Sequence, residues 1–199
     1  MNRDKSLNVC LFCLLVALGV VGRWLGPADA PNFTPIAAIG LFAGCIFSRR
    51  SVALVVPLMS LVISNLFLPA YASWQMLITV YASFLIAPLL GRALRAKPTA
   101  GKAIVAAVLP AVFFYLTTNL AQWIVDGQHV HMMYDRNWSG LADCYAAGIP
   151  FFRWMLEGDL LFSGLLFGTY GLAQWAVRRH LWPRRFPAVA HVRRPDCRC

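Results

Sequence analysis

The sequence contains few charged residues, and acidic residues above all are scarce. Of its 199 residues, 13% are charged, with eight Asp and Glu against 18 Lys and Arg, whereas 59% are hydrophobic. A typical soluble domain has about 25% charged residues, and a soluble domain of this size could not bury so much apolar surface. This composition excludes a soluble enzyme, a disordered chain and a secreted disulfide scaffold.

The recognisable motifs of catalysis are also missing. There is no serine-nucleophile motif, no phosphate-binding glycine loop and no H-E-x-x-H helix, each of which marks a defined reaction chemistry. We therefore predict no catalytic residues, no metal and no cofactor. One alternative stays open, because His129 and His131 could form a metal site with Asp126 or Asp135.

Long uncharged runs are what the sequence does contain. Each run is about as long as the ~20-residue helix that crosses a bilayer, and the run over residues 51–91 is long enough for two. We predict an all-α fold, a polytopic membrane bundle of six transmembrane helices within residues 1–179, followed by a basic cytoplasmic tail over 180–199. The predicted spans are residues 7–25, 34–48, 52–68, 74–91, 103–125 and 158–178.

The basic residues indicate how this bundle is oriented. Fifteen of the 18 would lie on the side of the N-terminus, and only Arg23, Arg136 and Arg153 on the other side. This is the positive-inside pattern, so we predict a multi-pass protein of the cytoplasmic membrane with both termini in the cytoplasm. The net charge of +10 thus reflects topology and attraction to lipid headgroups, and we predict no nucleic-acid partner.

The first span has a second interpretation, as a cleaved signal peptide. Arg3 and Lys5 precede an apolar stretch, and Ala28-Asp29-Ala30 matches an A-x-A cleavage site. Pro31 directly after that site counts against cleavage. We expect a retained helix, and the orientation of the other spans is the same in either case.

The segment between the fifth and sixth spans has an apolar pattern of its own. Its apolar residues recur at helical spacing, which predicts a helix lying on the outer surface or over the mouth of the bundle. We expect Gly148 and Pro150 to end this helix before the sixth span. The residues of the pattern are Trp138, Leu141, Ala142, Tyr145, Ile149 and Phe152.

Polar side chains gather toward the outer ends of the spans. In the fifth span Tyr115, Asn119, Gln122 and Asp126 follow at spacings of 4, 3 and 4, which places them on one helix face. Such residues usually face the interior of a bundle, so we predict an outward-facing pocket with Arg23 as a counter-ion for one of the acids. The alternative is ordinary polar helix ends with an interfacial aromatic belt. The predicted pocket residues are Asn32, Asn65, Asn119, Gln122, Trp123, Tyr145 and Asp159.

Several short motifs resemble those of a known family. The five motifs are Pro31-Asn32-Phe33-Thr34-Pro35, Ser64-Asn65, Thr118-Asn119, Cys144-Tyr145 with Gly148-Ile149-Pro150, and Gly158-Asp159. Over residues 20–172 the chain resembles a family of small bacterial integral membrane proteins that has no established function and is described as transport proteins. That family is similar in layout to the S components of ECF transporters, the six-helix subunits that capture vitamins from the outer side.

The resemblance implies a role and a choice of partners. It implies a subunit that takes up a small solute of vitamin or cofactor-precursor type. S components dock on their energising module through small residues of the first span, often A-x-x-x-A, whereas this chain has only Gly19 and Gly22 there. The chain could therefore bind an ECF-type energising module or act as a solitary protein. The family also commonly carries an acid where this chain has Asn65.

Three functions follow from the sequence. The leading hypothesis is a membrane protein that binds a small solute on the outer side for uptake, with the lipid bilayer and the solute as its partners. The second is a membrane-embedded enzyme that uses His129 and His131 with an outer acid. The third is a membrane assembly or sensor subunit that does not transport.

Overall fold

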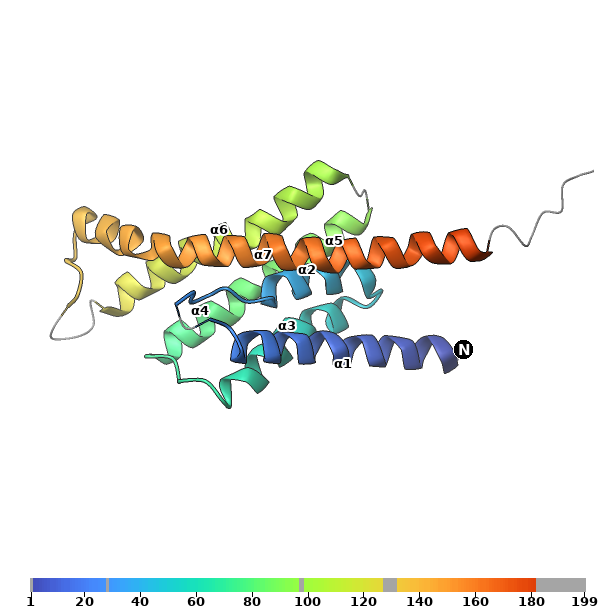
Figure 1. Ribbon diagram of the computed structural model, residues 1–199. Coiled ribbons are helices and arrows are strands. Elements are labelled where there is room, and N and C mark those ends of the chain that lie inside the picture. Colours follow the sequence, from blue (N-terminus) through green and yellow to red (C-terminus); the bar gives the residue numbers. More distant parts are fainter. Residues whose placement is uncertain (1, 28, 97–98, 127–131, 182–199) are drawn as a thin grey trace, which may run out of the picture.

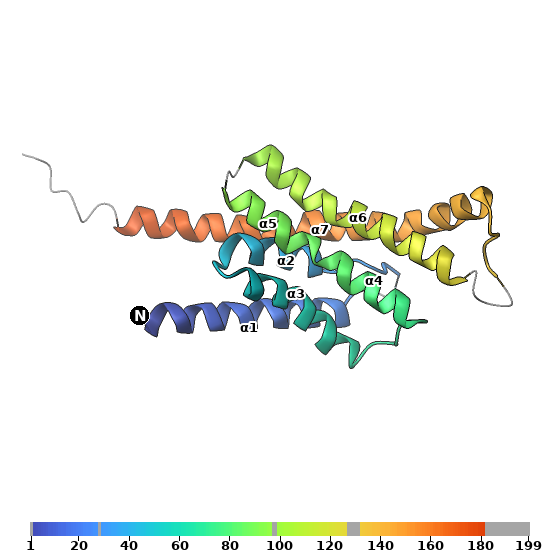
Figure 2. The same ribbon diagram turned by 180° about the vertical axis from the view of Figure 1, so that it is seen from behind.

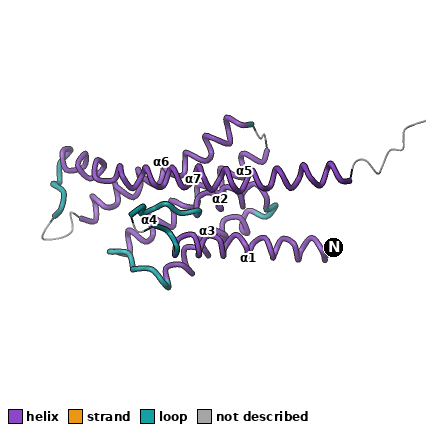
Figure 3. Tube along the Cα trace, viewed as in Figure 1, coloured by secondary structure: helices purple, strands orange, loops and turns teal. Residues whose placement is uncertain are grey.

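The chain is helical throughout the part that the structure describes. The computed structural model describes residues 2–27, 29–96, 99–126 and 132–181, and these form seven helices and no strand (Figures 1 and 3). The predicted all-α class is confirmed for these residues. The helices are α1 (Asn2–Trp24), α2 (Ile36–Ile46), α3 (Arg50–Asn65), α4 (Trp74–Phe84), α5 (Ile86–Ala96), α6 (Ala100–Asp126) and α7 (Trp138–Leu181).

The helices run back and forth between two ends of an elongated bundle. Seen in Figure 1, and from behind in Figure 2, α1, α3 and α6 run toward the end where α1 stops at Trp24. The helices α2, α4, α5 and α7 run back toward the end where α3 begins at Arg50. We call these the Trp24 end and the Arg50 end.

Helix α2 lies at the centre of the bundle. Its eleven residues include no charged side chain, and the nine from Ile36 to Gly44 are buried. It packs against α5, α3 and α7. A helix that is hydrophobic all round is stable only when other elements enclose it, and α2 meets this condition.

Small residues let α2 and α5 pack backbone to backbone. A Cβ atom at Gly44 would overlap the carbonyl oxygen of Pro88, and one at Gly91 would overlap the carbonyl oxygen of Leu41. The Cys45 thiol also donates to the Gly91 carbonyl at 3.0 Å. Close approach of this kind is the usual consequence of small residues at one-turn spacing in membrane helices.

The predicted span over 74–91 is divided into two helices. Helix α4 ends at Phe84 and α5 begins at Ile86, so that only Leu85 separates them. Pro88 has no N–H to donate to the Phe84 carbonyl four residues earlier. At the break the Leu85 N–H donates to the Ala82 carbonyl, three residues earlier, at 3.1 Å. The sequence did not predict this interruption.

The prediction of a separate surface helix before the sixth span is wrong. Helix α7 is continuous over 44 residues, from Trp138 to Leu181, with Pro150 inside it. Its first turns lie at an angle to the rest (Figure 1), so the proline bends the helix without ending it. At about 1.5 Å per residue α7 is about 66 Å long, roughly twice the thickness of a bilayer core.

Four helical stretches are long and apolar enough to cross a membrane by length and composition. They are Lys5–Trp24, Trp74–Arg95, Gly101–Asp126 and Trp138–Arg179. The predicted spans 34–48 and 52–68 correspond to the shorter apolar helices α2 and α3. These long apolar helices indicate a membrane protein. Nearly all of the predicted tail, residues 182–199, lies outside the described residues.

Candidate functional site

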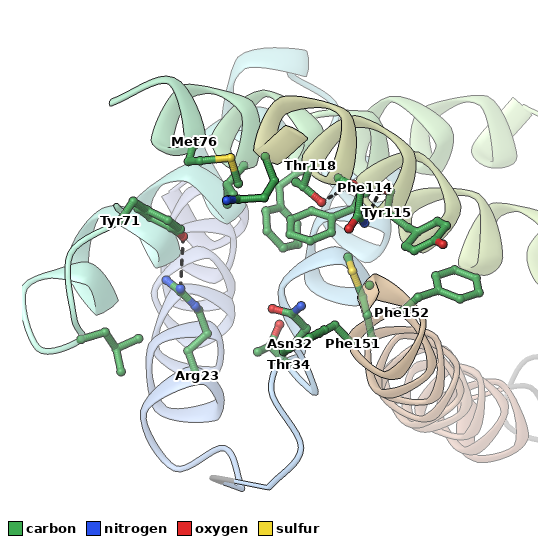
Figure 4. Close-up of a pocket in the computed structure, with 17 residues that line it drawn as sticks. Arg23, Asn32, Thr34, Tyr71, Met76, Phe114, Tyr115, Thr118, Phe151 and Phe152 are labelled. Carbon is green, nitrogen blue, oxygen red and sulfur yellow. Dashed lines mark hydrogen bonds between the residues drawn. The ribbon is translucent and has the colours of Figure 1, made fainter. Parts of the chain in front are cut away.

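A cavity of about 470 Å³ opens among the helices near the Trp24 end (Figure 4). Side chains from α1, α4, α6 and α7 surround it, together with the segments before α2 and after α3. Its volume is in the range of small-molecule sites. Its lining residues are Arg23, Asn32, Thr34, Leu68, Tyr71, Met76, Val80, Phe84, Phe114, Tyr115, Thr118, Asn119, Gln122, Gly148, Phe151, Phe152 and Met155.

The polar stripe predicted on the fifth span forms one wall. Tyr115, Thr118, Asn119 and Gln122 of α6 all line the cavity. The Asn119 side chain donates through Nδ2 to the Tyr115 carbonyl at 2.8 Å. Its Oδ1 faces Gly148 of α7, where a Cβ atom would overlap it. Glycine at 148 thus allows α7 to approach the amide closely.

Arg23 is held on the opposite wall by uncharged groups. Its Nη1 donates to Ser64 Oγ at 2.6 Å and to Asn65 Oδ1 at 2.8 Å, and its Nη2 donates to the Tyr71 hydroxyl at 3.4 Å. Asn65 in turn donates through Nδ2 to the Tyr81 hydroxyl at 2.8 Å. These bonds connect α1, α3, the turn after α3 and α4.

The remaining wall is aromatic. The rings of Phe84 and Phe114 lie 5.2 Å apart, and those of Tyr115 and Phe152 lie 5.0 Å apart. These separations suit offset and tilted ring pairs. Figure 4 shows Phe114 and Tyr115 of α6 and Phe151 and Phe152 of α7 lining the cavity where the two helices come together. An apolar or aromatic group could therefore bind against this wall.

Asn32 enters the cavity from a strained backbone. Its φ is 71°, the one positive φ of a non-glycine residue among those described, and Asn adopts this left-handed region more readily than most residues. In Figure 4 Asn32 and Thr34 lie between Arg23 and Phe151. Strained backbone of this kind is found most often at functional sites.

The structure brings four of the seven predicted pocket residues together. Asn32, Asn119 and Gln122 line the cavity, and Asn65 holds its arginine. The other three predicted residues, Trp123, Tyr145 and Asp159, do not line it.

Trp123 and Tyr145 hold segments of the chain together. The Trp123 Nε1 donates to the Asp135 carbonyl at 2.9 Å, and the Arg136 guanidinium lies 4.7 Å from the centre of its ring. The Tyr145 hydroxyl donates to the Leu116 carbonyl at 2.7 Å, which ties α7 to α6. A direct contact of either side chain with a solute stays a prediction.

Asp159 is buried with one of its carboxyl oxygens unpartnered. The residue is 1% exposed, and its Oδ2, like Oγ of Ser163 one turn later, makes no hydrogen bond in the described part of the chain. Arg23 is not its counter-ion, because the one ion pair found among the described residues joins Arg153 to Glu157 at 2.9 Å. Among the described residues that line the cavity, Arg23 instead carries the only charge.

Several cavity residues were not predicted. Tyr71 and Leu68 lie in irregular chain after α3, where no periodicity reveals which way a side chain points. Met76, Phe114 and Phe151 are apolar residues in apolar helices, so their pattern is the same as that of core or lipid-facing positions. Arg23, by contrast, could be recognised from the sequence as a candidate pocket residue, because it is a charged residue near the end of an apolar span.

The predicted histidine site cannot be placed. His129 and His131 lie outside the described residues, and the described residues contain no group of three His, Cys, Asp or Glu side chains that could hold a metal ion. Asp126, one of the proposed acids, accepts hydrogen bonds from the backbone N–H groups of Met133 and Tyr134 at 2.7 and 2.9 Å. This carboxylate therefore fixes the chain that leaves α6.

Comparison with known proteins identifies a family but no characterised relative. Neither the curated proteins nor the solved structures include a match to this chain. One family model matches residues 3–184, nearly the whole chain. The protein therefore belongs to DUF6580, a family of unknown function.

Proposed function

We propose that this chain is an uptake protein of the bacterial inner membrane, with six spans and both termini in the cytoplasm, that binds a small solute from the outer side. The observation that carries the proposal is the cavity near the Trp24 end. The opposite end carries the exposed Arg49, Arg50 and Arg92. Because basic residues concentrate on the cytoplasmic side, a cavity at the Trp24 end would open outward.

The two short helices are compatible with six spans. Eleven residues of α2 are about 16 Å long, less than the ~30 Å of a bilayer core. Non-helical chain at membrane depth is tolerated where protein covers it. Nine residues of α2 are buried, so its ends would lie among neighbouring helices rather than in lipid.

The resemblance to S components supports solute capture, but the first helix favours a solitary protein. A Cβ atom at Gly19 would lie 2.5 Å from Ser60 Oγ, and one at Gly22 would lie 2.5 Å from Pro35 Cγ. These glycines are already used for packing within the chain. Docking on an ECF-type energising module would therefore need another surface.

Release of a bound solute tests the proposal. Protein is purified from membranes in mild detergent, denatured, and the small molecules released are identified by mass spectrometry. We compare wild type with Met76→Trp, which fills the cavity, and with Met133→Trp, whose position is 74% exposed and outside the cavity. We expect one compound at near-stoichiometric amount from wild type and Met133→Trp, and a loss of at least tenfold from Met76→Trp.

The same three variants are then compared in uptake. Cells that express wild type or Met133→Trp should deplete the identified compound from the medium faster than cells that express Met76→Trp. Equal amounts of compound from all three proteins, or equal depletion, would contradict the proposal. The orientation is tested by fusing to the C-terminus a fluorescent protein that matures only in the cytoplasm. We expect fluorescence, and a fusion that is not fluorescent would contradict a cytoplasmic C-terminus.

A further inference from the structure

The cavity has a fixed positive charge that nothing in the described chain neutralises. Arg23 is the one charged residue among those that line it. All three of its hydrogen-bond partners, Ser64, Asn65 and Tyr71, are uncharged. Hydrogen bonds from neutral groups orient a guanidinium, but they leave its charge in place.

None of the described acidic residues forms an ion pair with Arg23. Asp126 accepts two backbone N–H groups, and Glu157 pairs with Arg153. Asp159 forms no ion pair with Arg23. The C-terminal end of α1 offers only partial negative charge to a basic residue in its last turn.

Arg23 also retains unused donors. A guanidinium has five N–H donors in a planar fork, and the three bonds to protein use two of those on Nη1 and one on Nη2. Within the part of the chain that the structure describes, the N–H of Nε and the second N–H of Nη2 make no hydrogen bond, and they could bind a ligand. Planar, two-point recognition of a carboxylate or phosphate is the chemistry for which Arg is best suited.

The wall opposite Arg23 indicates the shape and polarity of the rest of the ligand. The rings of Phe114, Phe151 and Phe152 provide an apolar surface, and the side chains of Asn119 and Gln122 provide a few polar contacts beside it. The arrangement therefore suits a molecule with an anionic group at one end and a flat apolar body at the other.

We propose that the solute bound in this cavity is a small organic anion, with Arg23 holding its carboxylate or phosphate and the α6–α7 aromatic wall holding its apolar body. The inference rests on the proposed function, because it names the class of solute for the same cavity. A lipid phosphate could bring the same anionic chemistry, and the test below separates the two sources.

Three probes of matched shape test the charge preference. Binding of 2-naphthoate, its neutral amide and its cationic amidine is measured by calorimetry on the full-length protein in a maltoside detergent. We expect the anion to bind wild type at least tenfold more tightly than the amide, with the amidine weakest. Met76→Trp should abolish binding of all three probes, which would show that the probes bind in the cavity.

Variants of Arg23 and of its partner Asn65 test whether the charge of Arg23 causes the preference for the anion. Arg23→Gln should remove the preference for the anion, and Arg23→Lys should keep part of it. Asn65→Asp should also remove it, because a carboxylate at the 2.8 Å position would neutralise Arg23. Arg153→Gln removes the same charge from an exposed position outside the cavity and should bind like wild type.

The outcomes separate the inference from the proposed function. If all three probes bind equally and Met76→Trp abolishes their binding, the cavity is a binding site but the inference is wrong. If no probe binds wild type, the inference is wrong, whereas the proposed function is decided separately by the solute released from the purified protein. Native mass spectrometry tests the lipid source: phosphatidylglycerol retained by wild type and lost from Arg23→Gln, without any preference for naphthoate, would overturn the inference.

Discussion

The guanidinium of Arg23 and the side-chain amide of Asn65 face each other at 2.8 Å, and the same amide donates to the Tyr81 hydroxyl at 2.8 Å. Asn65 thus joins α1, α3 and α4 while it fixes the direction of the arginine. The sequence placed Asn65 in the pocket as a ligand contact, whereas the structure gives it the part of a positioning residue.

Replacing this amide with an apolar side chain should destabilise the protein. In Asn65→Leu, Arg23 and Tyr81 each lose a hydrogen-bond partner, and we expect the free energy of unfolding to fall by about 1–3 kcal/mol. Tyr81→Phe removes only one of the two bonds and should cost less. Thermal unfolding in detergent measures both, and an equal loss in the two variants would contradict this order.

A methyl group between α2 and α5 should force the two helices apart. In Gly44→Ala and Gly91→Ala the new carbon would overlap backbone atoms of Pro88 and Leu41, which cannot rotate away as a side chain could. Overpacking of this kind costs about 1–3 kcal/mol. We expect each variant to unfold at a lower temperature than wild type.

Two glycines of α7 provide the matched control. A Cβ atom at Gly164 or Gly168 would meet nothing within 4 Å, and alanine favours a helix by up to about 1 kcal/mol over glycine. We expect Gly164→Ala and Gly168→Ala to be neutral or stabilising. If they unfold at as low a temperature as Gly44→Ala, steric overlap is not the cause of the destabilisation in Gly44→Ala.

Substitution of Gly148 should act through Asn119. The Cβ atom of Gly148→Ala would overlap the Asn119 amide, whose side chain can turn away, so we expect a small loss of stability but a clear loss of ligand binding. The double variant Gly148→Ala with Asn119→Ala should recover the stability, because the overlap is gone. A double-mutant cycle on the free energy of unfolding measures the coupling between the two residues. If the effects of the two single substitutions simply add, the proposed contact is contradicted.

Removing the charge of Asp159 should not destabilise the protein. A carboxyl group with a buried, unpartnered Oδ2 is costly to ionise, and Asn has the same shape without an ionisable group. We expect Asp159→Asn to unfold at the temperature of wild type or above it, and to release as much solute as wild type. A marked loss of stability would instead reveal a partner for the carboxylate, such as a bound cation.

The sequence predicted the helical class and the polar face of α6 because both follow from patterns within single helices. The 4, 3 and 4 spacing of Tyr115, Asn119, Gln122 and Asp126 is a property of α6 alone, and three of these residues line the cavity. Arg23 was detectable for the same reason, as a charge near the end of an apolar helix.

What could not be predicted depends on contacts between elements. Prolines at 57, 110 and 150 lie inside continuous helices, whereas Pro88 follows a break at Leu85. The residue type is the same in all four cases, so packing decides the outcome. Likewise, no pattern in the sequence shows that Asn65 contacts Arg23, 42 residues away.

The continuity of α7 links the cavity to the far side of the protein. Phe151, Phe152 and Met155 line the cavity, and the same helix continues without interruption to Leu181, some 40 Å farther at about 1.5 Å per residue. Because α7 is one unbroken helix over this length, a tilt of it at Phe152 on solute binding would displace its Leu181 end sideways in proportion to that length.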